Sequence, residues 1–450
     1  MKSLLKKWLP ILRKRMRKES LGGQVLGFGA GSLLQKSLGA LLIPLYIHAL
    51  KPEGLGTLAL IELVSSLALI LIGLGIPHAM VRMASSEERQ LANLLRTGVN
   101  PLLLSGIGSM LLLQLLAPFV ILALRLGPES VLLLRITLIT LPLLLLQRVF
   151  ESLWRIQRRA RRYSLVTTMG LGVTLVLTVA FLLGLGMAVE GILWARFWGA
   201  LLVVAVGLAD YGGLYLRGRT DRALRNRLLA FSLPIVPHKL NMVLNNSVDR
   251  LLLQYMIGPA AVGLYDLGAR VGVLIQRAMA PFEMAYIPWM FRRFDRKQDS
   301  GDASISIVSN GMLVLIAAGT LVLGIAGPWA VDLLDHSSKF ALPRELIPVL
   351  TLGFAVMLCY NVVSIPIFTA YRTKVMPLIS GSTALLNIVC NLLWIPEFGV
   401  MGAAWATLAS NLLMFLVGYL ISRRLQKIPC RNGLLAMGSA AGLVLWRALL

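Results

Sequence analysis

The segment "QYMIGPAAVGLYDLGARVGVLIQRAM", residues 254–279, has the apolar content of a membrane-spanning helix but also carries charged residues. Gly258 and Pro259 form a turn at which such a helix could begin. Asp266, Arg270 and Arg277 follow within the apolar run, where a charge at the bilayer centre costs about 2.5–3.5 kcal/mol or more. Charges in this setting usually pair inside a helix bundle or line a water-filled pathway, so the segment predicts a membrane protein with a polar interior.

The remaining sequence has the composition of a polytopic membrane protein. Of its 450 residues, 57% are hydrophobic and only 14% are charged, and the mean hydropathy is +0.78. These values exclude an ordinary water-soluble domain. Apolar stretches of roughly 18 or more residues are long enough to cross a hydrocarbon core about 30 Å thick. Twelve such spans are predicted, at 21–47, 54–78, 92–123, 130–150, 163–185, 189–211, 228–253, 260–285, 304–331, 345–369, 375–396 and 400–421. We expect helices, because strands would need to close into a barrel.

The net charge of +24 follows the pattern of membrane topology rather than that of nucleic-acid binding. Most of the 44 Lys and Arg lie in the N-terminal tail, in alternate loops and after the twelfth span. The intervening loops hold only four, namely Lys51, Arg125, Lys339 and Arg344. This bias predicts that both termini and the basic loops face the cytoplasm, in a cytoplasmic (inner) membrane. No soluble basic domain is evident in the sequence, so a nucleic-acid partner is excluded.

Short segments outside the spans define the predicted domain organisation. Residues 1–19 form a basic cytoplasmic interfacial segment, residues 217–227 a basic cytoplasmic linker, and residues 425–450 a cytoplasmic tail or partial thirteenth hydrophobic segment. The predicted N-terminal six-helix lobe covers 20–216 and the C-terminal six-helix lobe 228–424. No predicted loop has room for a soluble catalytic domain, so we do not expect an enzyme. The three cysteines show no metal-ligand spacing, and neither a metal nor another cofactor is expected.

An internal repeat relates the two lobes. "LKPEGLGTL" (50–58) and "IGPAAVGLY" (257–265) both place Pro and Gly four residues apart, and "VEGILWARF" (189–197) matches "VMGAAWATL" (400–408) at Val, Gly, Trp and Ala. Each copy has an even number of spans, so both enter the membrane from the same side as parallel repeats. Such repeats generally place the substrate between the halves.

Three longer segments contain or adjoin the repeated motifs: "LGALLIPLYIHALKPEGLGTLALIELVSSLALILIGLGIPHAMVR" (38–82), "NNSVDRLLLQYMIGPAAVGLYDLGARV" (245–271) and "WIPEFGVMGAAWATLASNLLMFLVGYLISRR" (394–424). Together they resemble the Wzx-type oligosaccharide flippases of the multidrug/oligosaccharidyl-lipid/polysaccharide exporter superfamily. The resemblance implies an all-α fold of two six-helix lobes in a V, with a cavity lined by spans one, two, seven and eight. It also implies alternating access that turns over an undecaprenyl-(pyro)phosphate-linked glycan.

Counting about 1.5 Å per residue from the helix starts places several charges deep in the spans. The predicted cavity residues are Lys36, Glu62, Arg196, Lys239, Asp266 and Arg270, with Asn241, Asn245, Asn246 and Arg277 as further candidates. Asp249 and Arg250 are expected near the outer surface. Cations outnumber acids at depth, and a positively charged, hydrated cavity would attract the phosphate of the lipid carrier.

Each candidate also has a structural interpretation. Asp266 and Arg270, one helical turn apart, could form a structural salt bridge. Arg277 could anchor at the headgroups, as could Arg135 in span four. His238, beside Pro237, could satisfy freed backbone groups, and the three Asn side chains could join helices by hydrogen bonds.

Two other function classes remain open from the sequence. A cation-coupled multidrug exporter could share the fold, but a cationic drug favours acidic residues at the midplane, and only Glu62 lacks an obvious partner in its own helix. A membrane glycosyltransferase or polymerase could use the same lipid carrier, although the acids at 332–345 form no plausible catalytic set. For the flippase, the expected partners are the lipid-linked glycan, membrane lipids, glycosyltransferases and a glycan polymerase, with H⁺ or Na⁺ coupling at an unassigned site.

Overall fold

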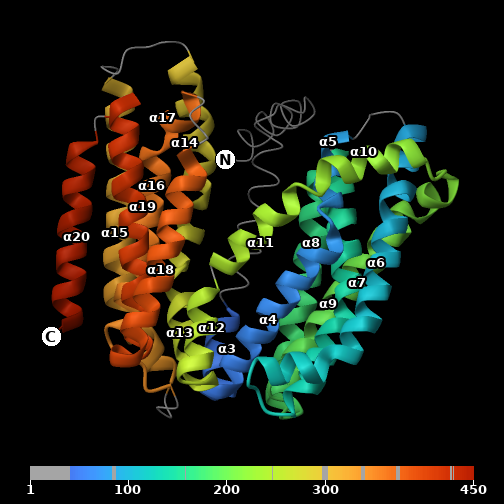
Figure 1. Cartoon of the computed structure of the whole chain (residues 1–450), viewed down its shortest axis with the longest axis horizontal. Helices are drawn as coiled ribbons and strands as arrows, with labels where there is room; N and C mark the ends of the chain where they lie inside the picture. The colour runs from blue at the N-terminus through green and yellow to red at the C-terminus, as the bar shows by residue number, and fades with distance from the viewer. Residues whose placement is uncertain are drawn as a thin grey trace, which may run out of the picture. The chain divides into compact units, whose positions relative to one another are not determined.

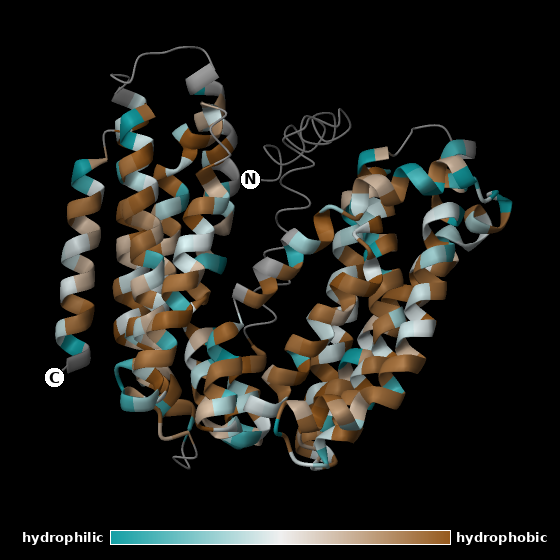
Figure 2. Ribbon diagram, viewed as in Figure 1, coloured by the Kyte–Doolittle hydropathy of each residue, from teal (hydrophilic) through white to brown (hydrophobic). Residues whose placement is uncertain are grey.

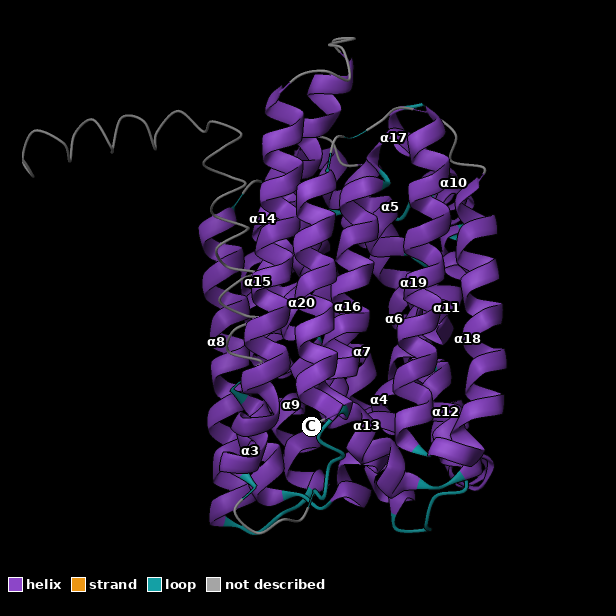
Figure 3. Ribbon diagram, turned by 90° about the vertical axis from the view of Figure 1, so that its left-hand side faces the viewer, coloured by secondary structure: helices purple, strands orange, loops and turns teal. Residues whose placement is uncertain are grey.

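The computed structural model describes residues 41–83, 88–157, 159–245, 247–295, 303–335, 340–370, 375–425, 428 and 430–449. Over these ranges the chain forms helices joined by loops and contains no strand, which confirms the predicted all-α class (Figure 3). Two compact units are present: unit 1 contains 64–120 and 131–243, and unit 2 contains 40–63, 121–130 and 244–450. Residues 40–63 and 121–130, which the sequence analysis included in the N-terminal lobe, thus group with unit 2.

Unit 1 is built around long antiparallel helices. Its core contains Met80, Leu95, Phe150, Trp154 and Tyr211, all almost fully buried. The Trp154 indole donates to Asp210 Oδ2 at 2.9 Å, and Asp210 also pairs with Arg162. The helices of unit 1 are the second part of α4 (Pro52–Gly73), α5 (Ile76–Met83), α6 (Glu88–Ala123), α7 (Ser130–Ile156), α8 (Ala160–Val179), α9 (Val189–Arg217), α10 (Arg222–Ser232) and α11 (Ile235–Asn245).

Unit 2 has a larger set of helices, which Figure 1 draws from yellow-green to red except for α3 and the start of α4, which are blue. α16 and α19 pack against each other, as do α18 and α19, and α15 packs against both α16 and α20. The helices are α3 (Leu42–Ala49), the first part of α4, α12 (Val248–Met256), α13 (Pro259–Gly272), α14 (Leu274–Asp295), α15 (Ala303–Leu334), α16 (Leu346–Val363), α17 (Ile365–Thr369), α18 (Met376–Phe398), α19 (Val400–Leu425) and α20 (Arg431–Leu449).

Nine helices within the described ranges are long and apolar enough to cross a membrane. They coincide with nine of the predicted spans and carry the predominantly brown residues in Figure 2. Most of the predicted first span, 21–47, lies outside the described residues, as does the predicted interfacial segment 1–19. The protein is a multi-pass membrane protein.

The predicted seventh and eighth spans are interrupted, where the sequence analysis expected continuous helices. The segment 228–253 is divided among α10, α11 and α12, and 260–285 is divided between α13 and α14. The first interruption includes Pro234, which has no backbone N–H to continue the helical ladder. Between α13 and α14 the break is a single residue, Val273, whose N–H still bonds to the Ala269 carbonyl at 2.9 Å.

The repeated motifs begin equivalent helices. Pro52 and Pro259 are the first residues of α4 and α13, and Val189 and Val400 are the first residues of α9 and α19. Gly258, with φ of 129°, forms the turn before α13, as the sequence predicted. The sequence repeat therefore corresponds to a structural one.

Most of the predicted linker 217–227 is ordered as the start of α10. Asp221 caps this helix, because its carboxylate accepts from the N–H groups of Ala223 and Leu224 at 2.8 and 3.1 Å. The Arg96 guanidinium donates to the carbonyl of Gly218 at 2.8 Å, which holds the linker against α6. The terminal segment 425–450 contains the helix α20.

Candidate functional site

In unit 2, α4 and α13 approach each other closely near their N-terminal ends. A Cβ added to Gly56 would lie 1.8 Å from the Pro259 carbonyl oxygen, and a Cβ added to Gly263 would lie 1.9 Å from the Pro52 carbonyl oxygen. The contact is reciprocal, since each glycine meets the proline of the other motif. Only glycine permits this backbone approach. The repeated Pro-Gly motifs are thus the contact between two equivalent helices.

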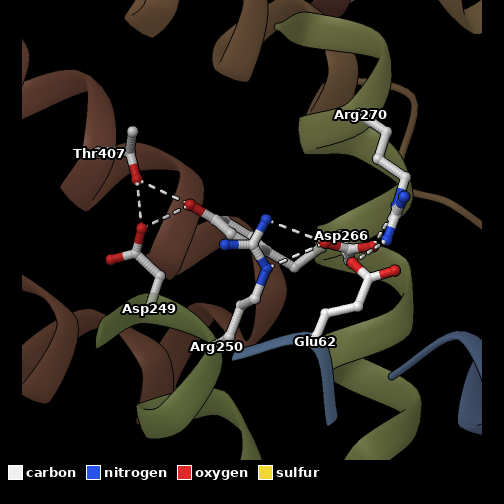
Figure 4. Close-up of polar contacts among 7 residues, drawn as sticks. Glu62, Asp249, Arg250, Asp266, Arg270 and Thr407 are labelled. Atoms are coloured by element: carbon white, nitrogen blue, oxygen red, sulfur yellow. Dashed lines mark hydrogen bonds and ion pairs between the residues drawn. The ribbon is translucent and has the colours of Figure 1, made fainter. Parts of the chain in front are cut away.

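About two turns beyond this crossing, four charged side chains form a continuous chain of ion pairs (Figure 4). Arg270 on α13 contacts Glu62 on α4 at 3.0 Å and also pairs with Asp266, one turn earlier on its own helix. Asp266 in turn binds Arg250 on α12 at 2.9 Å. The Asp266 side chain is only 4% exposed, whereas that of Glu62 is 29% exposed. The predicted pairing of Asp266 with Arg270 is confirmed.

The same cluster extends through Tyr265 to a second buried acid, Asp249. The Arg250 guanidinium lies over the Tyr265 ring, 5.9 Å from its centroid. The Tyr265 hydroxyl donates to Asp249 Oδ2 at 2.6 Å, and the Thr407 hydroxyl donates to the same oxygen at 3.0 Å. Asn391 donates to Asp249 Oδ1 at 2.7 Å. α12, α13, α18 and α19 are therefore joined by one polar network.

Asp249 and Arg250 were not among the predicted cavity residues, because depth along a continuous seventh span placed them near the outer surface. The structure buries Asp249, which is 5% exposed, and brings Arg250 into contact with Asp266. The sequence did contain one sign of this network, the polar residues Asn391 and Thr407 inside later apolar spans. Polar side chains in such spans need hydrogen-bond partners, and Asp249 accepts a hydrogen bond from each of these two residues.

The ion pairs change how Arg270 can act. Its charge is offset by two carboxylates, and the guanidinium also lies over the Tyr46 ring, 5.5 Å from the centroid. A phosphate at Arg270 would compete with these two acids for the guanidinium. This arrangement favours the structural role for Asp266 and Arg270 that the sequence analysis had kept open.

Lys239 has a different environment, within unit 1. Its ammonium on α11 lies 2.9 Å from Nε2 of His78 on α5. Arg148 and Arg155 on α7 are close enough to add to the positive potential at His78, and Glu151, which lies between them on the same helix, offsets part of their charge. Among the described residues, no acid forms an ion pair with Lys239. We call Lys239, His78, Arg148 and Arg155 the basic group.

The other predicted residues are less informative. Arg196 on α9 and Arg277 on α14 are both half-buried. Arg135 is exposed on α7, and its role as a headgroup anchor stays a prediction. Lys36 and Asn246 lie outside the described residues, as do the side chains of Asn241, Asn245 and His238. In the described ranges no three His, Cys, Asp or Glu side chains gather in a way that could hold a metal ion.

Comparison with known proteins places these features in a family context. Residues 25–294 match the family model described as "Polysaccharide biosynthesis protein". No curated protein matches the chain.

Solved structures are similar in fold at low sequence identity. A multidrug resistance transporter of the MATE family, in an inward-facing conformation, is 15% identical over 86% of this chain and 94% of its own, with a TM-score of 0.73. The lipid II flippase MurJ, in an inward closed conformation, is 14% identical over 94% of this chain and 92% of its own, also with a TM-score of 0.73. These likenesses support the transporter fold expected from the sequence.

Proposed function

Because the chain belongs to the polysaccharide biosynthesis protein family, we propose that it is a flippase that moves a lipid-linked oligosaccharide across the cytoplasmic membrane by alternating access. The cargo would be a glycan on an undecaprenyl-(pyro)phosphate carrier. The family match covers residues 25–294, and the fold is shared with the lipid II flippase MurJ. Nine apolar helices among the described residues agree with a transporter embedded in the bilayer.

The observation that carries the proposal is the basic group of unit 1. A phosphate leaving the headgroup region loses hydration, and positive donors in a partly buried setting offset this loss. Lys239 offers such a donor because its partner is the ring of His78 rather than a carboxylate. Arg148 and Arg155 add positive charge nearby, of which Glu151 offsets a part. We therefore assign phosphate recognition to Lys239 in preference to Arg270, whose charge is already offset by Glu62 and Asp266.

The MATE likeness makes a multidrug exporter the second candidate, and the acids of unit 2 argue against it. A cationic drug needs an acid that can accept it. Glu62, the acid that the sequence analysis considered for this role, is engaged with Arg270 at 3.0 Å. Asp249 already accepts from Tyr265, Thr407 and Asn391. A drug cation would have to compete with these contacts.

Transport by purified protein in liposomes tests the proposal. A lipid-linked oligosaccharide is placed in both leaflets, and a membrane-impermeant glycan oxidant measures how fast the inner pool becomes accessible. A charge-assisted hydrogen bond contributes about 1.5–3 kcal/mol, so Lys239→Gln should slow turnover about 10- to 100-fold. Lys239→Arg should keep part of the activity, and Lys51→Gln, an equal change of charge at an exposed position, should keep all of it.

Three results would overturn the proposal. Full activity of Lys239→Gln would remove the basic group from cargo recognition. Failure of the wild-type protein to turn over any lipid-linked glycan, combined with extrusion of a lipophilic cation, would favour the multidrug exporter. Release of a longer glycan or a free carrier would instead indicate a glycosyltransferase or polymerase.

A further inference from the structure

Helix α20 lies alongside α15 in parallel orientation (Figure 1). Near its start, the Gly433 N–H donates to Asn310 Oδ1 at 2.6 Å. Further along, the Val444 side chain meets Gly324, where an added Cβ would lie 2.8 Å from Val444 Cγ1. In its last turn, the Arg447 guanidinium lies 5.8 Å from the centroid of the Trp329 ring. The residue numbers of the contacting pairs rise together along α15 and α20, so the two helices run in the same direction and α20 ends near the end of α15.

The length and pattern of α20 suit a membrane crossing. Its 19 residues extend about 28 Å, close to the thickness of a hydrocarbon core. Leu435, Leu443 and Trp446 are more than half exposed in unit 2, as expected for side chains that face lipid. Arg431 and Arg447 stand near its two ends, where the chains can reach the headgroups. Those end charges lower the hydropathy of α20, which is not among the nine apolar candidates.

A pocket of about 840 Å³ opens where α15, α20 and the start of α16 meet. Trp329, Asp332, Arg344 and Arg447 contribute its polar and aromatic lining. All four side chains are exposed. Among the described residues, neither Arg344 nor Arg447 forms an ion pair with an acid, although Asp332 shares the pocket. The pocket therefore offers two guanidinium groups to a ligand.

We propose that this pocket binds the phosphate of an anionic bilayer lipid in the leaflet facing away from the cytoplasm, with α20 as a thirteenth membrane-spanning helix. The basic connection before α15 is predicted to be cytoplasmic, so the far end of α15 is external. The C-terminal end of α20 is then external too. The charge counts predicted a cytoplasmic C-terminus because they assumed twelve spans. With α20 as a thirteenth span, the C-terminal end of this helix lies on the external side instead.

The chemistry of the lining matches a lipid headgroup. Trp residues favour the level of the headgroups, where one edge of the ring is apolar and the other is wet. A guanidinium binds phosphate through paired N–H groups. The Trp329 ring keeps Arg447 at this level by a cation–π contact, and Arg344 approaches from the segment before α16. Apolar residues of the lining, including Ile325 and Leu333, can receive the beginning of the acyl chains.

Native mass spectrometry of the full chain tests the lipid site. Wild-type protein is released from micelles that contain equal amounts of phosphatidylglycerol and phosphatidylethanolamine. We expect phosphatidylglycerol to remain bound in preference, and Arg344→Gln with Arg447→Gln to reduce the retained fraction about tenfold or more. Arg344→Lys with Arg447→Lys should retain part of it. The matched control is Arg217→Gln with Arg219→Gln, which removes two exposed charges elsewhere and should not change retention.

Topology supplies an independent readout. A single reporter cysteine in Leu449→Cys should react with a membrane-impermeant thiol reagent added to intact cells. Equal retention of the two lipids by the wild-type protein, or unchanged retention by the Gln pair, would overturn the lipid site. Labelling of Leu449→Cys only after the cells are opened would overturn the external position of the pocket.

Discussion

Replacing Gly56 by alanine should separate the two helices that carry the repeated Pro-Gly motifs. The new Cβ would lie 1.8 Å from the Pro259 carbonyl oxygen and 2.9 Å from the Gly263 nitrogen. Both are backbone atoms of α13, so no side-chain rotation relieves the collision. Since real Cβ contacts are almost never below 3.0 Å, the crossing must open by about 1.2 Å, the difference between 3.0 and 1.8 Å.

The structure sets the size of the expected effect. Overpacking usually costs about 1–3 kcal/mol even where side chains can adjust. Here the obstacle is backbone, so we expect a cost of about 3 kcal/mol or more. Opening the crossing would also lengthen the contact between Glu62 and Arg270, now 3.0 Å. Alanine also has a better helix propensity than glycine by about 1 kcal/mol, which partly offsets the destabilisation by the collision. A control glycine-to-alanine variant is needed to measure this stabilising contribution separately.

Gly212→Ala is that control. Gly212 lies inside α9, and an added Cβ there would meet nothing within 4 Å. Both variants gain the same propensity, so the difference in their thermal unfolding midpoints reports the collision. The midpoints are measured in the same detergent and at one heating rate, because membrane proteins often unfold irreversibly. Gly56→Ala and Gly263→Ala should both fall well below wild type. Midpoints as high as that of Gly212→Ala would refute the close crossing.

Three further predictions concern charges and caps. In a double-mutant cycle, Glu62→Gln and Arg270→Gln should be non-additive in unfolding free energy by about 0.5–3 kcal/mol, because the two side chains contact each other; additive effects would contradict the ion pair. Asp249→Ala should lower the free energy of unfolding by about 3 kcal/mol or more, because it strands buried hydroxyl and amide donors, including Thr407; denaturant titration should show a smaller loss for Thr407→Val. Asp221→Ala should cost about 1 kcal/mol through loss of the cap on α10; hydrogen exchange should rise in the first turn of that helix and not in α9.

The sequence was sufficient to predict most of the helices and the repeat. Long apolar runs determine where a helix must form, because the backbone in lipid has to satisfy its own hydrogen bonds. This is why α15, α18 and α19 begin within a few residues of the predicted spans. The repeated Pro and Val positions were also informative, because each of them is the first residue of a helix. Where apolar runs contain Pro, as at Pro234, length alone predicted one helix in place of two or three.

The polar network was harder to predict, because its members come from helices that are distant in sequence. The spacing of Asp266 and Arg270 on one helix was visible, and their pairing was predicted correctly. The contacts of Arg270 with Glu62, and of Asp249 with Asn391, join residues 208 and 142 positions apart. One sequence gives no direct signal for such pairs. The depth of each charge in its predicted span therefore indicated more cations than acids inside the membrane. It did not show which of these cations form ion pairs with carboxylates.

The side chains that Arg270 and Lys239 contact decide which of these two cations is better suited to bind the phosphate. Arg270 and Lys239 both looked suited to a phosphate, because each lay deep in a predicted span. The structure separates them by what they contact: Arg270 contacts two carboxylates, and Lys239 contacts an imidazole. An anion at the Arg270 guanidinium would compete with those acids, whereas the Lys239 ammonium lies beside His78, with Arg148 and Arg155 nearby and partly offset by Glu151. We therefore expect changes at Arg270 to act through stability and changes at Lys239 to act through transport. A Lys239→Gln variant that unfolds like the wild type but fails to move lipid-linked glycan would show this separation directly.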